Sequence, residues 1–166
     1  MNETEILDLY SKYSDMVYRI AVSYLRQSQD AEDVVQAVFM KLIEGKVQPE
    51  IGKERALLTR ITINHCKDLL RSAWKRWIVP LEKIEESYVF EYEQDCELFH
   101  AVMNLPCKLR VVVHFHYYEG YTFAEIASML NISSSAVSMR LHRARKILRN
   151  NYKEDWNHAN KLQTNI

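Results

Sequence analysis

The chain has 166 residues, 48% of them hydrophobic and 27% charged, which is enough for one modest core or two small ones and too few for a large multidomain enzyme. Three Gly and three Pro are too few for the frequent turns of a β-sandwich or barrel, so the composition predicts an all-α fold. The 22 basic and 22 acidic side chains cancel. Neither a long apolar stretch nor a basic N-terminus occurs, so we expect neither secretion nor direct membrane insertion. The three Cys residues lack CxxC spacing, which fits a cytoplasmic protein.

Three long helices are predicted in the first half of the chain. The first runs from Ile6 to Tyr24, where apolar side chains recur at steps of three and four. The second is expected to begin at Asp30, whose carboxylate can accept hydrogen bonds from the free amides of the first turn. The segment from Gly45 to Gly52 contains Pro49 and is predicted to be a loop. A third helix is expected from Lys53 to about Trp77.

Charge then changes sign along the chain. Residues 57–79 carry five basic side chains and one acidic side chain, whereas residues 85–97 carry six acidic and no basic ones. This pattern predicts two small helical domains joined by an acidic connector. We expect a first domain at 5–78, an acidic linker at 79–96, a second domain at 97–152 and a C-terminal tail at 153–166.

The second domain is expected to open with Pro106 at a first helical position, where its missing amide costs nothing. Residues 111–118, VVVHFHYY, have the composition of a strand, but we predict a helix because the segment that follows needs one beside it.

Residues 120–149 have the pattern of a helix-turn-helix. Asn131 can adopt the left-handed conformation that ends a short helix, and Ser133 is placed to cap a second one. In such a motif the second helix enters the major groove while arginines hold phosphates. The alternative, a solvated basic helix packed on another helix, explains the apolar stripe but not the order of a short helix, a turn and a basic helix. The candidate DNA-binding residues are Ser133, Ser134, Ser135, Ser138, Arg140, His142, Arg143, Arg145 and Arg149.

Two parts of the chain resemble the extracytoplasmic-function group of bacterial RNA polymerase sigma factors. Their region 2 is similar to DAEDVVQAVFMKLIE with ERALLTRITINHCKDLLRS, and their region 4 to LPCKLRVVVHFHYYEGYTFAEIASMLNISSSAVSMRLHRARKILR. The resemblance implies an alternative sigma factor without a cofactor that directs promoter-specific initiation. It implies docking on the β′ clamp helices of core RNA polymerase, opening of the −10 element by the first domain, and reading of the −35 element beside the β flap by the second. It also implies an anti-sigma factor as a partner.

Matched residue by residue, the resemblance implies two sites in the first domain. The polymerase-docking positions are Asp30, Asp33, Gln36 and Phe39, although helix capping by Asp30 and core packing by Phe39 explain those two equally well. The positions that face the −10 element are Asn64, Asp68, Arg71, Trp74, Lys75 and Arg76. An intrahelical pair of Asp68 with Arg71 is the alternative for those two, and Trp74 with Trp77 would either stack on unpaired bases or cover a core edge.

The sequence departs from the family pattern at three positions. Leu57 stands where Trp is common, Asn131 where Gly is common, and Ser138 where the recognition helix commonly has Lys or Arg. The third change removes a cation, so Arg140 is expected to be the first charged group to reach base edges, with Arg143 and Arg145 mainly on phosphates.

Other functions stay open at this point. A transcription regulator with the same helix-turn-helix would use the first domain for dimerisation. A metal site would draw on Cys96, His100, Cys107, His114 and His116, but residues 114 and 116 point to different sides of a helix. Catalysis is not expected, because neither a Gly-rich phosphate loop nor a nucleophile elbow accompanies the polar residues.

Overall fold

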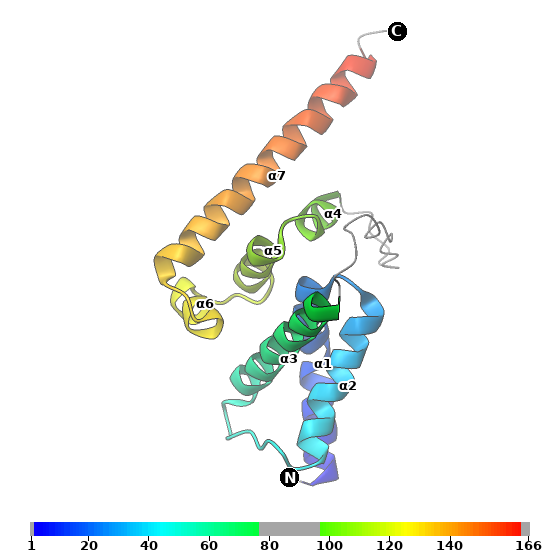
Figure 1. The fold of residues 1–166 in the computed structure, drawn as a ribbon, viewed down its shortest axis with the longest axis vertical. Helices are drawn as coiled ribbons and strands as arrows, with labels where there is room; N and C mark the ends of the chain where they lie inside the picture. Colours follow the sequence, from blue (N-terminus) through cyan, green and yellow to red (C-terminus); the bar gives the residue numbers. More distant parts are fainter. Residues whose placement is uncertain (1, 77–96, 164–166) are drawn as a thin grey trace. The chain divides into compact units, whose positions relative to one another are not determined.

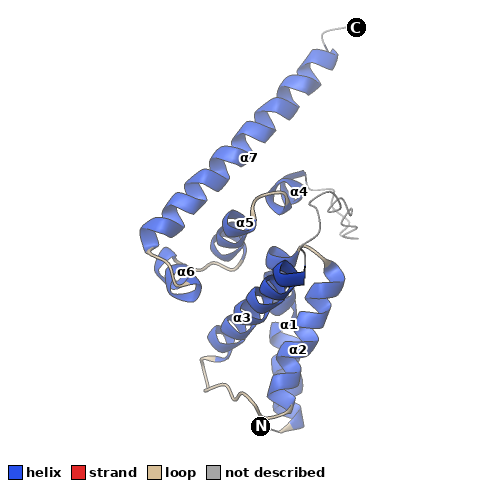
Figure 2. Ribbon diagram, viewed as in Figure 1, coloured by secondary structure: helices blue, strands red, loops and turns tan. Residues whose placement is uncertain are grey.

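The computed structural model describes residues 2–76 and 97–163, and within these the side chains of 2–73 and 98–151. The described residues form helices and contain no strand, which confirms the all-α fold (Figure 2). The chain divides into two compact units, Met1–Tyr92 and Glu93–Ile166. The predicted acidic linker at 79–96 lies outside the described residues, as does Trp77. None of the helices described has the length and hydropathy needed to cross a membrane.

The first unit consists of α1 (Glu3–Leu25), α2 (Ser28–Ile43) and α3 (Glu54–Arg76), as Figure 1 shows. α1 begins earlier than its apolar stripe because Asn2 and Glu5 form a capping box. The Asn2 side chain accepts a hydrogen bond from the Glu5 amide at 2.8 Å, and the Glu5 carboxylate accepts one from the Asn2 amide at 2.8 Å. Together, α1, α2 and α3 confirm that the first half of the chain forms the three predicted helices.

The predicted start of α2 at Asp30 is wrong. Arg26 adopts a left-handed conformation (φ 64°) that ends α1, and the chain re-enters a helix at Ser28. Gln27 is the N-cap residue and makes no side-chain capping bond. Asp30 lies inside the first turn of α2 and is not its N-cap residue. Its negative charge there interacts favourably with the positive end of the helix dipole.

The core of the first unit lies between its three helices, because α1 packs against both α2 and α3. Each helix supplies apolar side chains at helical spacing, and the largest of these are fully buried. The fully buried large residues of this unit are Val17, Ile20, Val34, Val38, Leu42, Leu58 and Ile63. This core determines which faces of α2 and α3 are turned outward.

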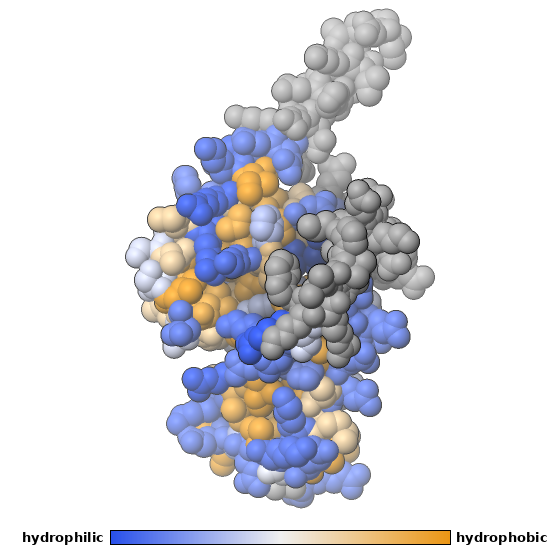
Figure 3. Space-filling model, viewed as in Figure 1, coloured by the Kyte–Doolittle hydropathy of each residue, from blue (hydrophilic) through white to orange (hydrophobic). Residues whose placement is uncertain are grey.

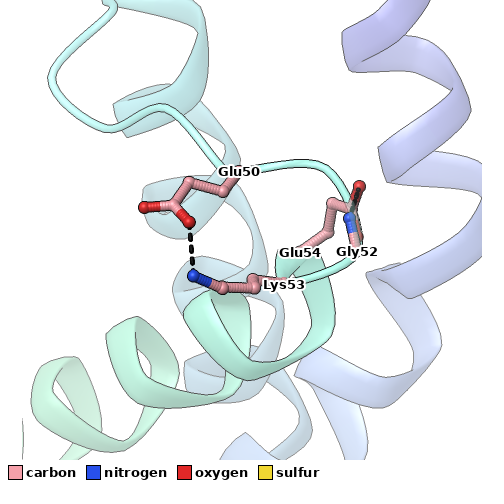
Figure 4. A network of polar contacts seen from close by, with 4 residues as sticks. All are labelled: Glu50, Gly52, Lys53 and Glu54. Atoms are coloured by element: carbon pink, nitrogen blue, oxygen red, sulfur yellow. Dashed lines mark hydrogen bonds and ion pairs between the residues drawn. The ribbon is translucent and has the colours of Figure 1, made fainter.

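The loop between α2 and α3 ends in a tight turn, shown in Figure 4. The Lys53 amide donates to the Glu50 carbonyl at 2.9 Å, and the side chains of these two residues form an ion pair. Gly52 has a positive φ of 83°, which favours glycine, and its amide donates to the Glu54 carboxylate at 2.9 Å. Hydrogen bonds from the amides of Gly52 and Glu54 lower the pKa of the Glu54 carboxyl. The turn therefore fixes the start of α3.

The second unit consists of α4 (Glu97–Met103), α5 (Cys107–Val113), the π-helical turn η1 (His114–Tyr118), α6 (Phe123–Leu130) and α7 (Ser134–Gln163). Pro106 precedes the first helical residue as N-cap (φ −51°, ψ 141°), one position before the place predicted. Residues 111–118 are helical, as predicted, but their second half widens into the π-turn. α7 continues past residue 153, where a tail was expected.

Arg110 ties α4 to α5. Its side chain is 3% exposed, and Nη1 donates to the carbonyl oxygens of Met103 at 3.1 Å and Leu105 at 2.7 Å. These carbonyls lie at or just after the end of α4, where helical carbonyls lack partners within the helix. A buried guanidinium therefore closes the corner between the two helices.

The histidines of the π-turn have contacts inside the second unit. His114 Nε2 lies 3.3 Å from Glu119 Oε1, and both side chains are buried. The His114 ring stacks on Tyr118, with centroids 5.5 Å apart. His116 Nδ1 lies 3.1 Å from the Tyr121 carbonyl oxygen. These contacts join the π-turn to the segment that leads into α6.

Candidate functional site

Three of the four predicted docking residues are exposed on α2. Asp30, Asp33 and Gln36 face solvent, whereas Phe39 is 3% exposed and its ring meets that of Tyr10 edge to face at a centroid distance of 4.9 Å. Core packing therefore accounts for Phe39, and a docking role for its ring is not supported by this geometry.

Sequence reasoning missed an apolar residue on the same face. Met40 is 41% exposed and lies seven residues after Asp33 and four after Gln36, so the three share one side of α2. The helical spacing alone could have identified it. Figure 3 shows that, on the face of the molecule that it draws, hydrophobic residues (orange) lie among hydrophilic ones (blue). The outer face of α2 is thus acidic at its start and apolar further along, which suits a partner helix with basic and apolar side chains.

A second surface lies on α3. Asn64, Asp68 and Arg71 are exposed on one face, as their spacing predicts. Arg71 Nη2 lies 3.5 Å from Asp68 Oδ1, so the alternative pair does form, but both side chains are 67% exposed and such a pair contributes little to stability. Trp74, Lys75 and Arg76 occupy the last turn of α3, and their side chains lie outside the described ones.

His65 lies on α3 beside this face. Burial lowers the pKa of its imidazole, and so does the charge of Lys41, while Asp68 acts in the opposite direction. Because the net direction is downward from 6.5, the imidazole is neutral at pH 7. The positive charge of this surface at neutral pH therefore comes from its Arg and Lys side chains.

The third surface belongs to the helix-turn-helix. Thr122 and Glu125 form a capping box at the start of α6, with the Glu125 carboxylate 2.8 Å from the Thr122 amide. Asn131 is left-handed (φ 55°, ψ 51°) and ends α6, as predicted. The Ser133 hydroxyl accepts a hydrogen bond from the Ala136 amide at 3.1 Å, which confirms its predicted capping role.

Packing between α6 and α7 fixes which face of α7 is free. Ile126 and Ala127 of α6 are buried, and Val137, Leu141 and Ala144 of α7 are 0% exposed. The two alanines allow the helices to approach closely. α7 therefore turns one apolar stripe inward and its polar side outward.

Most of the predicted DNA-binding residues lie on this outward side. The exposed ones are Ser133, Ser134, Ser135, Ser138, His142, Arg143, Arg145 and Arg149. Arg140 differs, because it is only partly exposed and lies two positions from both Ser138 and His142, which is about 200° around the helix. The geometry does not support the expectation that Arg140 is the first cation to reach base edges. Sequence reasoning also missed Met139 and Lys146, which are exposed beside His142 and Arg143.

The residues considered for a metal site are not brought together in the part of the chain that the structure describes. No group of three His, Cys, Asp or Glu side chains that could hold an ion occurs there, and Cys96 lies outside it. Burial raises the pKa of the Cys107 thiol, although Arg110 and Lys108 act against this, so the thiolate that binds metals is disfavoured.

Comparison with known families assigns both units. The family description "Sigma-70 region 2" matches residues 9–76, and "Sigma-70, region 4" matches residues 97–148. The chain belongs to the sigma-70 family. A dimerisation domain in the first unit is the less well supported alternative, because that unit matches a sigma region in the family order.

Related sigma factors carry the name of the extracytoplasmic-function group. The sigma factor SigE of Mycolicibacterium smegmatis is 28% identical over 155 residues, which cover 86% of this chain and 59% of SigE. The chain thus spans little more than half the length of that relative. The RNA polymerase sigma factor SigV of Bacillus subtilis, whose name does not include the group, is 28% identical over 137 residues, covering 80% of this chain and 81% of SigV.

Solved structures show the same fold. The sigma factor RpoE of Bartonella quintana, in complex with the anti-sigma factor NepR, has a TM-score of 0.72 at 19% identity and covers 90% of this chain and 97% of RpoE. CnrH, in complex with the cytosolic domain of CnrY, has a TM-score of 0.61 at 22% identity and covers 93% of this chain and 91% of CnrH. At these identities the likeness concerns the fold of the sigma factor.

Proposed function

We propose that this sigma factor binds core RNA polymerase and directs initiation at promoters that contain −10 and −35 elements. The observation that carries the proposal is the pairing, in one chain, of a region 2 unit and a region 4 helix-turn-helix unit, each with an exposed polar surface. Its site of action would be the cytoplasm, where polymerase and promoter DNA are found.

The outer face of α2 would dock on the β′ clamp helices. Asp30 and Asp33 provide carboxylates near the start of the helix, and Gln36 and Met40 continue the same side toward its end. Charge complementarity of this kind steers association and fixes register, while an apolar contact adds affinity that salt does not screen.

Promoter recognition would be divided between the two units. The face of α3 with Asn64, Asp68 and Arg71 would meet the −10 element, and the outer side of α7 would enter the major groove of the −35 element beside the β flap. Each surface carries few cations, so each would make few phosphate contacts and bind weakly alone at physiological salt. Core polymerase would join the two contributions.

Runoff transcription tests this function directly. Core polymerase of the same organism would be mixed with the full chain and genomic fragments. We expect specific transcripts that require both components. A helix-turn-helix regulator would instead bind its DNA sites without core polymerase and produce no transcripts with it, and that result would overturn the proposal.

An anti-sigma factor is proposed as a further partner. Support comes from the two solved relatives, of which RpoE is bound to an anti-sigma factor and CnrH to a cytosolic domain. Because docking and DNA-binding surfaces are exposed on α2, α3 and α7, an inhibitor that covers one of them would block a separate step of initiation.

Reversing the charge of Asp33 should weaken binding to core polymerase by on the order of tenfold, because an attractive charge contact with a basic coiled coil becomes repulsive. The affinity of Asp33→Lys for core polymerase would be measured by pull-down titration. Asp8→Lys provides the matched control, since Asp8 is an exposed acid on α1 and the change in net charge is the same. Equal affinities of both variants and the unchanged chain would remove Asp33 from the docking surface.

A further inference from the structure

Met139 stands out among the apolar residues of α7. Val137, Leu141 and Ala144 face α6 or the core and are 0% exposed, whereas Met139 is 54% exposed. It is the sixth residue of the helix, so it lies in the part of a recognition helix that approaches base edges. Its exposure is not explained by packing inside the second unit.

Three of the four neighbours of Met139 on the helix surface are polar, and the fourth is the small, partly exposed Ala136. Ser135 lies four residues before it, and His142 and Arg143 lie three and four residues after it, all of them exposed. The other exposed large apolar residue of α7 with a described side chain, Ile147, lies eight residues further along. Met139 is therefore a single apolar side chain within a hydrogen-bonding surface, rather than part of a broad apolar patch.

The major groove offers one apolar group to such a side chain. Each base pair displays donors and acceptors there, and thymine adds its C5-methyl group. Serine hydroxyls donate or accept and so suit several bases, which means that Ser135 and Ser138 give little discrimination by themselves. A flexible thioether can cover a methyl group and exclude water from it.

We propose that Met139 is a specificity-determining residue that contacts the methyl group of a thymine in the −35 element. This inference rests on the proposed function and adds to it the base that one position of α7 reads.

Uracil substitution isolates the methyl group. The full chain would be assembled with core polymerase, and the promoter fragment that it transcribes most would be prepared with each −35 thymine replaced in turn by deoxyuridine. Affinity of the unchanged chain, Met139→Ala and the matched control Ile147→Ala, which shortens the other exposed apolar side chain of α7, would be measured on every duplex. Because alanine favours the helix, these changes should leave α7 intact, which a thermal melt would check.

We expect the affinity of the unchanged chain to fall about fourfold when one particular thymine is replaced by deoxyuridine. A fourfold change corresponds to about 0.8 kcal/mol, the free energy of burying one methyl group in an apolar contact. Ile147→Ala should show the same loss at that position. Met139→Ala should bind the thymine duplex about as weakly as the unchanged chain binds the uracil duplex, with no further loss on uracil.

Three outcomes would overturn the inference while leaving the sigma function intact: a transcribed promoter with no thymine in its −35 element, no uracil-sensitive position, or equal sensitivity in Met139→Ala. A fall in core polymerase affinity of Met139→Ala without any change on uracil duplexes would assign the side chain to a protein contact instead. Absence of promoter-specific transcripts with the unchanged chain would overturn the sigma function and the inference together.

Discussion

Replacing Arg110 by methionine should lower the free energy of unfolding of the second unit by about 2 to 5 kcal/mol, because two carbonyl groups at a buried corner lose their charged donor. Methionine matches much of the length of the arginine stem, so the change tests the hydrogen bonds more than the packing. The guanidinium now donates to the carbonyls of Met103 and Leu105, and neither carbonyl can reach water easily beside a side chain that is 3% exposed.

Amide hydrogen exchange would measure this effect unit by unit. Protection should fall in α4 and α5 of Arg110→Met and stay unchanged in α1 and α2, since the two units have separate cores. Lys108→Met is the control, because Lys108 is an exposed cation on the same helix. A loss below about 1 kcal/mol, or an equal loss in the control, would show that the corner tolerates the missing donor.

Arg110→Met also separates the two contacts proposed for the sigma factor, that of α2 with core polymerase and that of the helix-turn-helix with the −35 element. If the second unit loosens while the first stays folded, the affinity for core polymerase through α2 should be largely retained, whereas selection at the −35 element should be lost. This division follows from the placement of the docking face and of the helix-turn-helix in different units.

Sequence rules for local structure predicted the helices and their ends well where a single local interaction determines them. The apolar stripe of α1, the left-handed Asn131 and the Ser133 cap depend on a few residues close in sequence, and the structure has all three. The prediction of where α2 begins was wrong because the turn at Arg26 was not recognisable from the sequence. Arginine is an unusual residue for the left-handed conformation that Arg26 adopts. The role of Arg110 was not predicted, because a charged side chain inside an apolar helix gives no sign in the sequence of the carbonyl groups that it will bind.

For the surfaces, residue chemistry was weighed before the angular position of each residue on its helix. Phe39 and Met40 are neighbours in sequence, but only Met40 shares the outer face with Asp33. In α7, Arg140 was favoured for its charge, although its position relative to Ser138 places it on another side. The angle could have been worked out from sequence; the burial of one side of the helix required the structure.

Removing both Arg145 and Arg149 should weaken promoter binding about 30-fold near 0.15 M salt without changing the preferred −35 sequence. The two are exposed, four residues apart, and late in the helix-turn-helix, where a recognition helix diverges from the bases toward the backbone. The Arg145 guanidinium lies back along α7, with Nε 3.4 Å from the Leu141 carbonyl, so it extends along the helix. If each arginine neutralises one phosphate, the double variant should reduce the slope of log affinity against log salt by about 1.8.

Binding-site selection and a salt titration of the holoenzyme would test both parts of this expectation. Arg140→Ala serves as the comparison, because its side chain is partly buried on another side of α7 and should contribute neither to the slope nor to the choice of base. A changed −35 preference in Arg140→Ala, together with an unchanged slope in the double variant, would mean that α7 enters the groove rotated by about 100° from the orientation inferred here, which brings Arg140 to the place of Met139. In that orientation Met139 would leave the base edges, so the same data would also contradict the proposed thymine contact.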